Sequence, residues 1–576
     1  MKEKVVNFLK SKWLFAVVLN AVILFFCVAV SSFSYENFSD YQNSILISNF
    51  HYYYNNNINY ILCILIGSVQ FILRNFNCYV LALVMLSWAS FTGITYVFAD
   101  KFSKKIALFF SLILNVLFAL NHYADVESSK TAAILLGAGF LMVLNAIRNK
   151  SYKLPFIIGV SEILLGSFLD YKYFFIALGF AFAYFLADMI SKRKYKIAFR
   201  KFFWYFRPFL LVFAFVSLLA VSLNYYSFSV NNSSAETSSY YTYSQLTDSI
   251  GNLPYPNYSE NAEEFKAVGI TSKNDYEMLK KGYYDSSTSL NNKALELVKE
   301  IQQKNNTKTI WASFSDMAYH LIEHIYPFDD FALIVIMFVI LAVVFIVYQK
   351  RRFSFFPIFL IITAIISSTL LRYFYAIKHY NIYGIWLIMF TMLLFSFDFS
   401  QRRPINLVSR ATEIKHKIPI ATLVIAVLLG VFSFAYQISL PTYNKSDRPG
   451  ALFSEINKHP ERYYVLDPET AVEYMKHTDN FRHPMWGFNS NFVKNIDSFG
   501  YLHKRTQLMK KGLPQNIYKA VIDSKKVFVI DKSIVFKKEE YLNKYYSGGK
   551  NNISYHQQND IKGYKIYSVS AEYLGS

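Results

Sequence analysis

Apolar blocks of about 17 to 22 residues recur along the chain, and a helix of that length crosses the hydrocarbon core of a bilayer. Charged residues make up only 17% of the sequence, whereas soluble domains carry about a quarter. We therefore expect a mainly α membrane protein with about eleven transmembrane helices. The expected spans are 13–32, 78–98, 106–121, 131–147, 154–170, 173–190, 205–226, 331–348, 353–371, 380–398 and 418–437.

The positions of Lys and Arg predict the side of the membrane that each loop faces. The chain has 59 Lys+Arg against 39 Asp+Glu, a net charge of +20. If the N-terminus is cytoplasmic and the shorter apolar block 58–73 does not span, most of the basic loop residues fall on the cytoplasmic side, as the positive-inside rule requires. If 58–73 spans, the bias reverses. We expect a multi-pass protein of the cell membrane with a cytoplasmic N-terminus, 58–73 at the outer surface or re-entrant, and no nucleic-acid partner.

Three longer segments are then expected outside: the first outer loop 33–77, an insertion 227–330 and a tail. The tail is typical of a small α/β unit. Tyr463–Leu466 and Val527–Ile530 are predicted strands, and 553–556 with 564–569 a closing hairpin. This organisation predicts a polytopic membrane domain, 1–437, and an extracytoplasmic α/β domain, 438–576.

The first outer loop carries an acidic pair directly after the first span. Glu36 and Asp40 are four residues apart and would share one face of a helix. No Lys or Arg follows until Arg74, so a partly desolvated carboxylate here should have a raised pKa. That chemistry suits a general base acting on a sugar hydroxyl. The alternative is a solvated loop with helix-capping acids.

Two short outer loops add further ionisable residues. Asp125 and Glu127 follow one span and could supply a second acid or a metal ligand. Asp170, Tyr171 and Lys172 form a tight turn at membrane depth, where ionisable groups need partners or a wet cavity. Asp125 and Glu127 are candidates for the second outer acids. Asp170, Tyr171 and Lys172 are candidates for substrate binding. Helix capping, and an ion pair between Asp170 and Lys172, are the alternatives.

A cationic outer segment contains Arg372, Lys378 and His379. Basic residues on the outer side run against the charge rule, and a lipid phosphate would explain them. Arg372 can hold a phosphate with two hydrogen bonds, and the others can stabilise charge on a leaving phosphate. The alternative is snorkelling toward lipid headgroups.

Three common catalytic signatures do not occur in the sequence. It has no P-loop, G-x-S-x-G or G-x-G-x-x-G pattern. Cys27, Cys63 and Cys78 lie in or beside apolar blocks, so the insertion and tail have no disulfide framework or Cys-based zinc site.

The acidic pair after span one, in a plan of about eleven spans with outer segments, resembles the glycosyltransferase-C superfamily. Within it the chain looks most like bacterial O-antigen or wall-polymer glucosyltransferases of the glucosyltransferase II type. The resemblance implies transfer of a sugar from a polyprenyl-phosphate-linked donor to a cell-surface glycan acceptor at the outer membrane face, with membrane lipid as a further partner.

That resemblance gives Glu36 and Asp40 the place of the first-loop acids, Asp125 or Glu127 that of the second acid, and Arg372 a phosphate contact. Adjacent Asp-Asp or Asp-x-Asp is commoner in the family. The difference leaves open which acid is the base and whether a divalent cation takes part. No cofactor is certain.

Other functions remain open at the level of sequence. A surface-polysaccharide polymerase or ligase has a similar span count and would depend on arginines. A transporter would place ionisable residues near the bilayer midplane, where Glu162 is the main candidate. A non-catalytic membrane protein is the remaining alternative.

Overall fold

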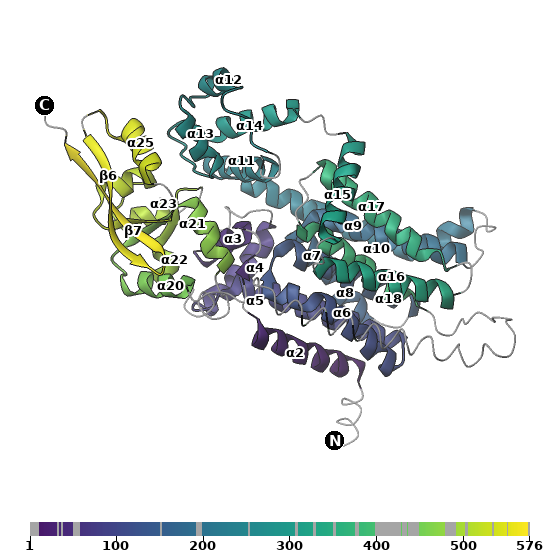
Figure 1. Cartoon of the computed structure of the whole chain (residues 1–576). Coiled ribbons are helices and arrows are strands. Elements are labelled where there is room, and N and C mark those ends of the chain that lie inside the picture. Colours follow the sequence, from purple (N-terminus) through teal and green to yellow (C-terminus); the bar gives the residue numbers. More distant parts are fainter. Residues whose placement is uncertain are drawn as a thin grey trace, which may run out of the picture.

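The structure is a computed structural model, in which a helical bundle carries a smaller mixed domain at one end (Figure 1). It describes residues 11–31, 34–35, 38–49, 58–149, 153–191, 199–250, 254–305, 309–325, 330–349, 353–374, 379–397, 428, 432, 435, 448–477, 491–500, 505–532, 535–549 and 551–573.

The bundle is built from long apolar helices. Those that coincide with predicted spans are α2 (Lys12–Val30), α5 (Cys78–Lys101), α6 (Lys104–Ala124), α7 (Ser128–Asn149), α8 (Lys153–Leu169), α9 (Tyr171–Ser191), α10 (Phe199–Asn231), α16 (Asp330–Tyr348), α17 (Phe356–Phe374) and α18 (His379–Ser396). The eleventh predicted span, 418–437, lies almost entirely outside the described residues. Within the described part of the chain, seven helices are long and apolar enough to cross a membrane, and three shorter ones are also apolar. The predicted mainly α membrane fold is confirmed.

Small residues allow the central helices to approach closely. A Cβ atom on Gly139 of α7 would lie 2.6 Å from the carbonyl oxygen of Gly159 on α8, and a Cβ on Gly159 would lie 2.8 Å from that of Gly139. Only glycine fits this crossing, which is a common way for membrane helices to pack. α7 is almost wholly buried and forms the centre of the bundle.

The two ends of the bundle collect different loops. At one end Lys12 and Asn145 both bind Asp100, at 2.7 and 2.9 Å. At the other end Ser129, at the start of α7, binds Asp170, between α8 and α9. The loops predicted to share the outer side therefore do lie together at one end, called here the cap end.

The ambiguous block 58–73 contains α4 (Tyr60–Ile72), whose 13 residues are about 20 Å long, too short to span the bilayer core. Its N-cap Asn59 donates its backbone N–H to Phe168 at the end of α8, 2.8 Å away. Near its other end Gln70 accepts from the backbone N–H of Cys78, which starts α5. Both partners are at the cap end, so α4 returns to the end from which it starts.

The tail forms a five-stranded sheet in the order β4-β3-β5-β7-β6. β4 (Ile496–Ser498), β3 (Tyr463–Leu466) and β5 (Val527–Asp531) are parallel. β7 (Tyr564–Tyr573) runs antiparallel to β5 and to β6 (Asn551–Ile561), which confirms the predicted strands and hairpin. The tail helices are α20 (Arg448–Lys458), α21 (Pro468–His477), α22 (Asn491–Asn495), α23 (Arg505–Lys510), α24 (Ile517–Asp523) and α25 (Val535–Tyr546).

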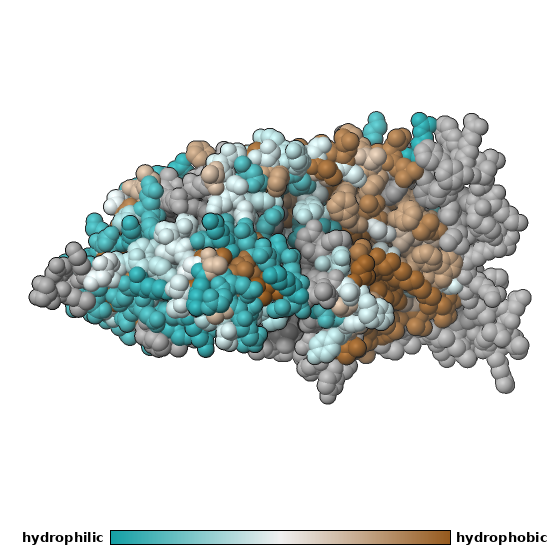
Figure 2. All heavy atoms as spheres, turned by 90° about the horizontal axis from the view of Figure 1, so that it is seen from above, coloured by the Kyte–Doolittle hydropathy of each residue, from teal (hydrophilic) through white to brown (hydrophobic). Residues whose placement is uncertain are grey.

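The insertion packs on one face of this sheet. It contributes α11 (Ala235–Ile250), α12 (Ala262–Ala267), α13 (Lys273–Lys280), α14 (Asn292–Asn305) and, next to the bundle, α15 (Ile310–Ile325). Tyr463 and Val465 join the core shared with the insertion, whereas Tyr464 and Leu466 face α20 to α22 and the larger core, as strand alternation requires. We call the insertion and tail together the cap. Figure 2 shows hydrophilic surface over the cap and hydrophobic surface over the bundle.

Candidate active site

A two-stranded parallel pairing brings together two loops that sequence analysis had singled out separately. β1 (Ser34–Tyr35) pairs with β2 (Asp125–Val126), with Ser34 opposite Asp125 and Tyr35 opposite Val126. The first outer loop therefore lies beside the turn between α6 and α7. Asp40 of the first loop and Asp125 and Glu127 of the second are therefore held at the cap end.

Asp40 lies on α3 (Phe38–Ser48) and is fully buried. One carboxylate oxygen accepts the hydroxyl of Tyr79, and the other accepts the backbone N–H of Ser128 at 3.0 Å. Ser128 is the first residue of α7, where the helix dipole favours a negative charge. Asp40 thus closes the N-terminus of a central helix, and both donors stabilise its charged form. Glu36, its predicted partner, lies outside the described residues.

The second loop supplies buried acids and a buried cation. Asp125 is 7% exposed, and Glu127 and Lys130 are each 1% exposed. The Lys130 ammonium donates to the backbone carbonyl of Asp125 at 3.4 Å and lies 5.8 Å from the ring centre of Tyr383 on α18. Lys130 is therefore a buried cation in the same loop as Asp125 and Glu127, and it is held by the backbone of that loop. Sequence reasoning did not select it, although a lysine at membrane depth next to two acids was a usable signal.

The tight turn between α8 and α9 joins the same cluster. Asp170 is buried and accepts from the hydroxyl of Ser129 at 2.9 Å and from the backbone N–H of Lys172 at 3.0 Å. It therefore caps α9 and contacts the start of α7. Tyr171 is 45% exposed. The fold connects Asp40, the second loop and Asp170 through consecutive residues, Ser128 and Ser129.

The predicted phosphate cations are placed differently. Arg372, near the end of α17, pairs with Asp316 of α15 at 3.2 Å; its side chain is 16% exposed and that of Asp316 is 66% exposed. Lys378 lies outside the described residues, as does the side chain of His379, the first residue of α18. Arg372 and Tyr383 flank the same α17–α18 connection, so this arginine is at the cap end.

His122 adds a buried polar group that the sequence analysis did not rank as a site residue. It lies on the last turn of α6 and is 3% exposed, with its ring 5.5 Å from Phe91 and 6.1 Å from Tyr383. Among the described residues neither ring nitrogen has a hydrogen-bond partner. Buried polar groups rarely lack partners except where water, an ion or a substrate serves them.

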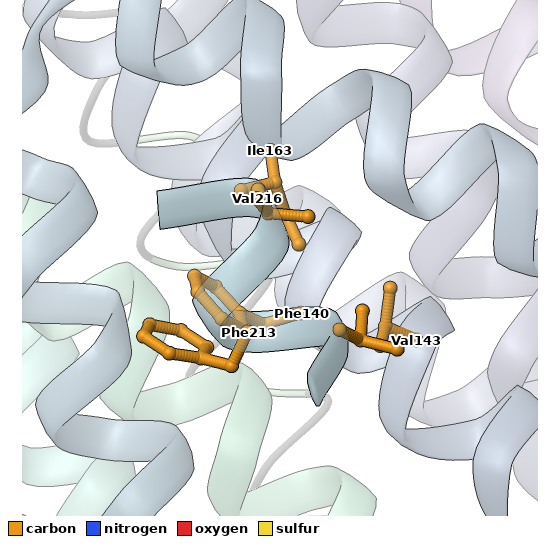
Figure 3. Close-up of a pocket in the computed structure, with 6 residues that line it drawn as sticks. Phe140, Val143, Ile163, Phe213 and Val216 are labelled. Carbon is orange, nitrogen blue, oxygen red and sulfur yellow. The ribbon is translucent and has the colours of Figure 1, made fainter. Parts of the chain in front are cut away.

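Two other observations bear on what the bundle can hold. The described residues contain no group of three or more His, Cys, Asp or Glu arranged to bind a metal ion. A cavity of about 10 Å³ lies between α7, α8 and α10 and is lined only by apolar side chains, including Phe140, Ile163 and Phe213 (Figure 3). Its size and lining mark a packing defect rather than a binding site.

The fold and the site together define a polytopic membrane protein that gathers buried acids and a lysine where its bundle meets a cap. No protein-family model matches the chain, and no curated protein matches it in sequence. The chain is similar in structure to ArnT from Cupriavidus metallidurans, seen in a crystal structure of the apo state. The identity is 10% and the TM-score 0.32, over 96% of this chain and 97% of that one.

Proposed function

We propose that this protein is a membrane glycosyltransferase that moves a sugar from a polyprenyl-phosphate carrier to a cell-surface glycan at the outer membrane face. The observation that carries the proposal is the convergence of Asp40, Asp125 and Asp170 with Lys130 at one end of the bundle. A proton acceptor and a cation in one water-poor place are what glycosyl transfer from a phosphate needs.

The proposed reaction is a single displacement. A hydroxyl of the acceptor attacks the anomeric carbon while its proton passes to a first-loop carboxylate, Asp40 or Glu36. The bond from that carbon to the phosphate oxygen breaks, and the lipid phosphate leaves with the electron pair. Lys130 stabilises the growing phosphate charge, and Asp125 or Glu127 orients the acceptor. No covalent enzyme intermediate is required.

Arg372, which the sequence predicted to bind phosphate, keeps a place in this proposal. Arg372 is at the cap end of α17, where the headgroup region of the outer leaflet would lie. Its partner Asp316 is mostly exposed, and such ion pairs are weak. A lipid phosphate can therefore replace Asp316 at Arg372 on the way to Lys130.

The experiment uses purified full-length protein in detergent with undecaprenyl phosphate and, as the neutral control, undecaprenol. We expect the phosphate to bind at least tenfold more tightly than the alcohol. Equal binding of both lipids by the wild type contradicts the use of a lipid phosphate. Glycan analysis of a deletion strain then separates the alternatives: missing side groups support transfer, and shortened chains support a polymerase.

A further inference from the structure

We propose that α21 is a strut through which the cap holds the first outer loop in place, and that Tyr474 is a positioning residue for Asp40. The catalytic consequence rests on the proposed function, whereas the mechanical link does not. α21 contacts both β1 and α3. In Figure 1 it lies between the sheet of the tail and α3.

The N-terminus of α21 is fixed by a buried ionic group. Asp467 directly follows β3 and accepts the backbone N–H of Thr470 at 3.1 Å, which caps the helix. The ammonium of Lys538 lies 3.2 Å from Asp467 and also pairs with Asp531 at the end of β5. All three charged side chains are at most 4% exposed. A helix capped by such a group cannot shift relative to the sheet without exposing or separating buried charges.

The insertion adds further contacts at the N-terminus of α21. The hydroxyl of Tyr283, between α13 and α14, donates to Asp467. Lys281 pairs with Glu469 in the first turn of α21 at 2.9 Å, and the backbone N–H of Tyr284 donates to Phe499 in the tail at 3.0 Å. Two segments of chain, one before α16 and one after α18, therefore meet at the start of the same helix.

The other end of the strut meets the acid-bearing loop. Tyr474 is fully buried, and its ring centre lies 6.4 Å from that of Tyr41, the neighbour of Asp40. Tyr41 meets Tyr35 of β1 edge to face at 5.8 Å, and the Tyr35 hydroxyl accepts from Asn77 before α5 at 2.6 Å. The three rings join α21 to α3, to β1 and to the start of α5.

Through these ring contacts the cap helps to determine the position of Asp40. Asp40 accepts hydrogen bonds from Tyr79 and Ser128 of the bundle. Its neighbour Tyr41 contacts Tyr474 on the cap side. If the ring of Tyr474 is removed, Tyr41 of α3 loses its ring contact with α21. Asp40 keeps its hydrogen bonds, and Leu46 of α3 keeps its packing against Tyr240 and Tyr284 of the insertion. The carboxylate is then present but less well held, and misplacement by about 1 Å costs about a hundredfold in rate.

The test compares three variants of the full-length protein. Tyr474→Leu removes the ring, Tyr474→Phe keeps it, and Phe265→Leu makes a matched loss in the insertion core, where Phe265 is fully buried on α12. Hydrogen exchange by mass spectrometry follows peptides covering 38–48. We expect exchange there to accelerate at least tenfold in Tyr474→Leu and to match the wild type in the other two.

The same variants are assayed for sugar transfer with varied donor. We expect kcat to fall between tenfold and a hundredfold in Tyr474→Leu with KM unchanged, and Tyr474→Phe to restore it. Wild-type exchange over 38–48 in Tyr474→Leu, or equal acceleration in Phe265→Leu, overturns the strut. Accelerated exchange in Tyr474→Leu alone, in a protein that transfers no sugar, leaves the strut standing and rejects the glycosyltransferase.

Discussion

The carboxylate of Asp40 accepts the backbone N–H of Ser128 at 3.0 Å across 88 positions of sequence. This bond fixes an acid of the first outer loop on the N-terminus of the helix that runs through the centre of the bundle. Because Ser129 and Lys130 follow at once, the position of Asp40 is set relative to Asp170 and to the buried ammonium. The site is held by the fold of three loops rather than by any one of them.

Asp40→Asn tests the proposed proton acceptor. The amide keeps the shape and one acceptor oxygen but is far less basic, so we expect sugar transfer in membranes to fall about 10²- to 10⁴-fold. Loss of a charged cap should lower the free energy of unfolding by only about 1 kcal/mol. Glu263→Gln, on an exposed helix of the insertion, is the control and should behave as wild type. Undiminished transfer in Asp40→Asn would rule out this residue as the base.

Lys130→Met tests the proposed phosphate cation against Arg372→Gln. Methionine nearly matches lysine in length, so the main loss is the charge among the acids. We expect a cost of about 1–3 kcal/mol in unfolding free energy, because the buried carbonyl of Asp125 loses its donor. We also expect Lys130→Met to lose the preference for undecaprenyl phosphate over undecaprenol. If only Arg372→Gln loses that preference, Lys130 is not the phosphate contact.

The sequence predicted the spans well because each is a local pattern of sufficient length. Tyr463–Leu466 and Val527–Ile530 were equally local, since four or five consecutive apolar residues suffice for a buried strand. The pairing of Ser34 with Asp125 could not be predicted, because two-residue strands carry no periodic signal. Lys130 was passed over although Asp125, whose carbonyl it binds, lies in the same loop. Its burial follows from Tyr383 on a distant helix, which single-sequence reasoning does not place.

The sequence also did not predict that the insertion and the tail share one hydrophobic core. Phe265 and Tyr276 look like the core of a self-contained insertion, yet the same core includes Val465 and Val529 of the tail sheet. Among the described elements α16, α17 and α18 of the bundle lie between the insertion, whose last helix ends at Ile325, and the tail, whose first helix begins at Arg448. Long-range packing of this kind is decided by the whole fold, not by propensity.

Lys538→Met tests the buried ionic group at the start of α21. Without the ammonium, Asp467 and Asp531 face each other unneutralised, and we expect a loss of about 3–5 kcal/mol in unfolding free energy. The triple variant that adds Asp467→Asn and Asp531→Asn should recover most of that loss, because no uncompensated charge remains. Thermal unfolding of the full-length protein measures both. A single variant as stable as the wild type would contradict the role of Lys538.

Alkaline pH should unfold the cap cooperatively. Burial raises the pKa of Tyr283, Tyr463 and Tyr518 well above the ordinary value of 10.0. Above pH 10 the unfolded chain therefore releases phenolic protons that the folded cap retains. The folded state then binds more protons than the unfolded one, so stability is unaffected below pH 10 and falls as the pH rises through it. Each tyrosine costs about 1.4 kcal/mol per pH unit.

One group opposes this loss. Burial lowers the pKa of Lys538, although Asp467 acts in the other direction. A lysine with a lowered pKa destabilises the folded state at neutral pH, and that cost is relieved as the pH approaches 10.5. Three tyrosines outweigh one lysine, so the net stability still falls. The part of the phenolate absorbance that Tyr518→Phe removes should therefore appear together with the change in near-ultraviolet circular dichroism of the full-length protein, above pH 10. Tyr518→Phe should weaken the pH dependence by about 1.4 kcal/mol per unit. If the absorbance assigned to Tyr518 instead appears in an ordinary titration at pH 10 with the dichroism unchanged, that ring is accessible to solvent in the folded cap.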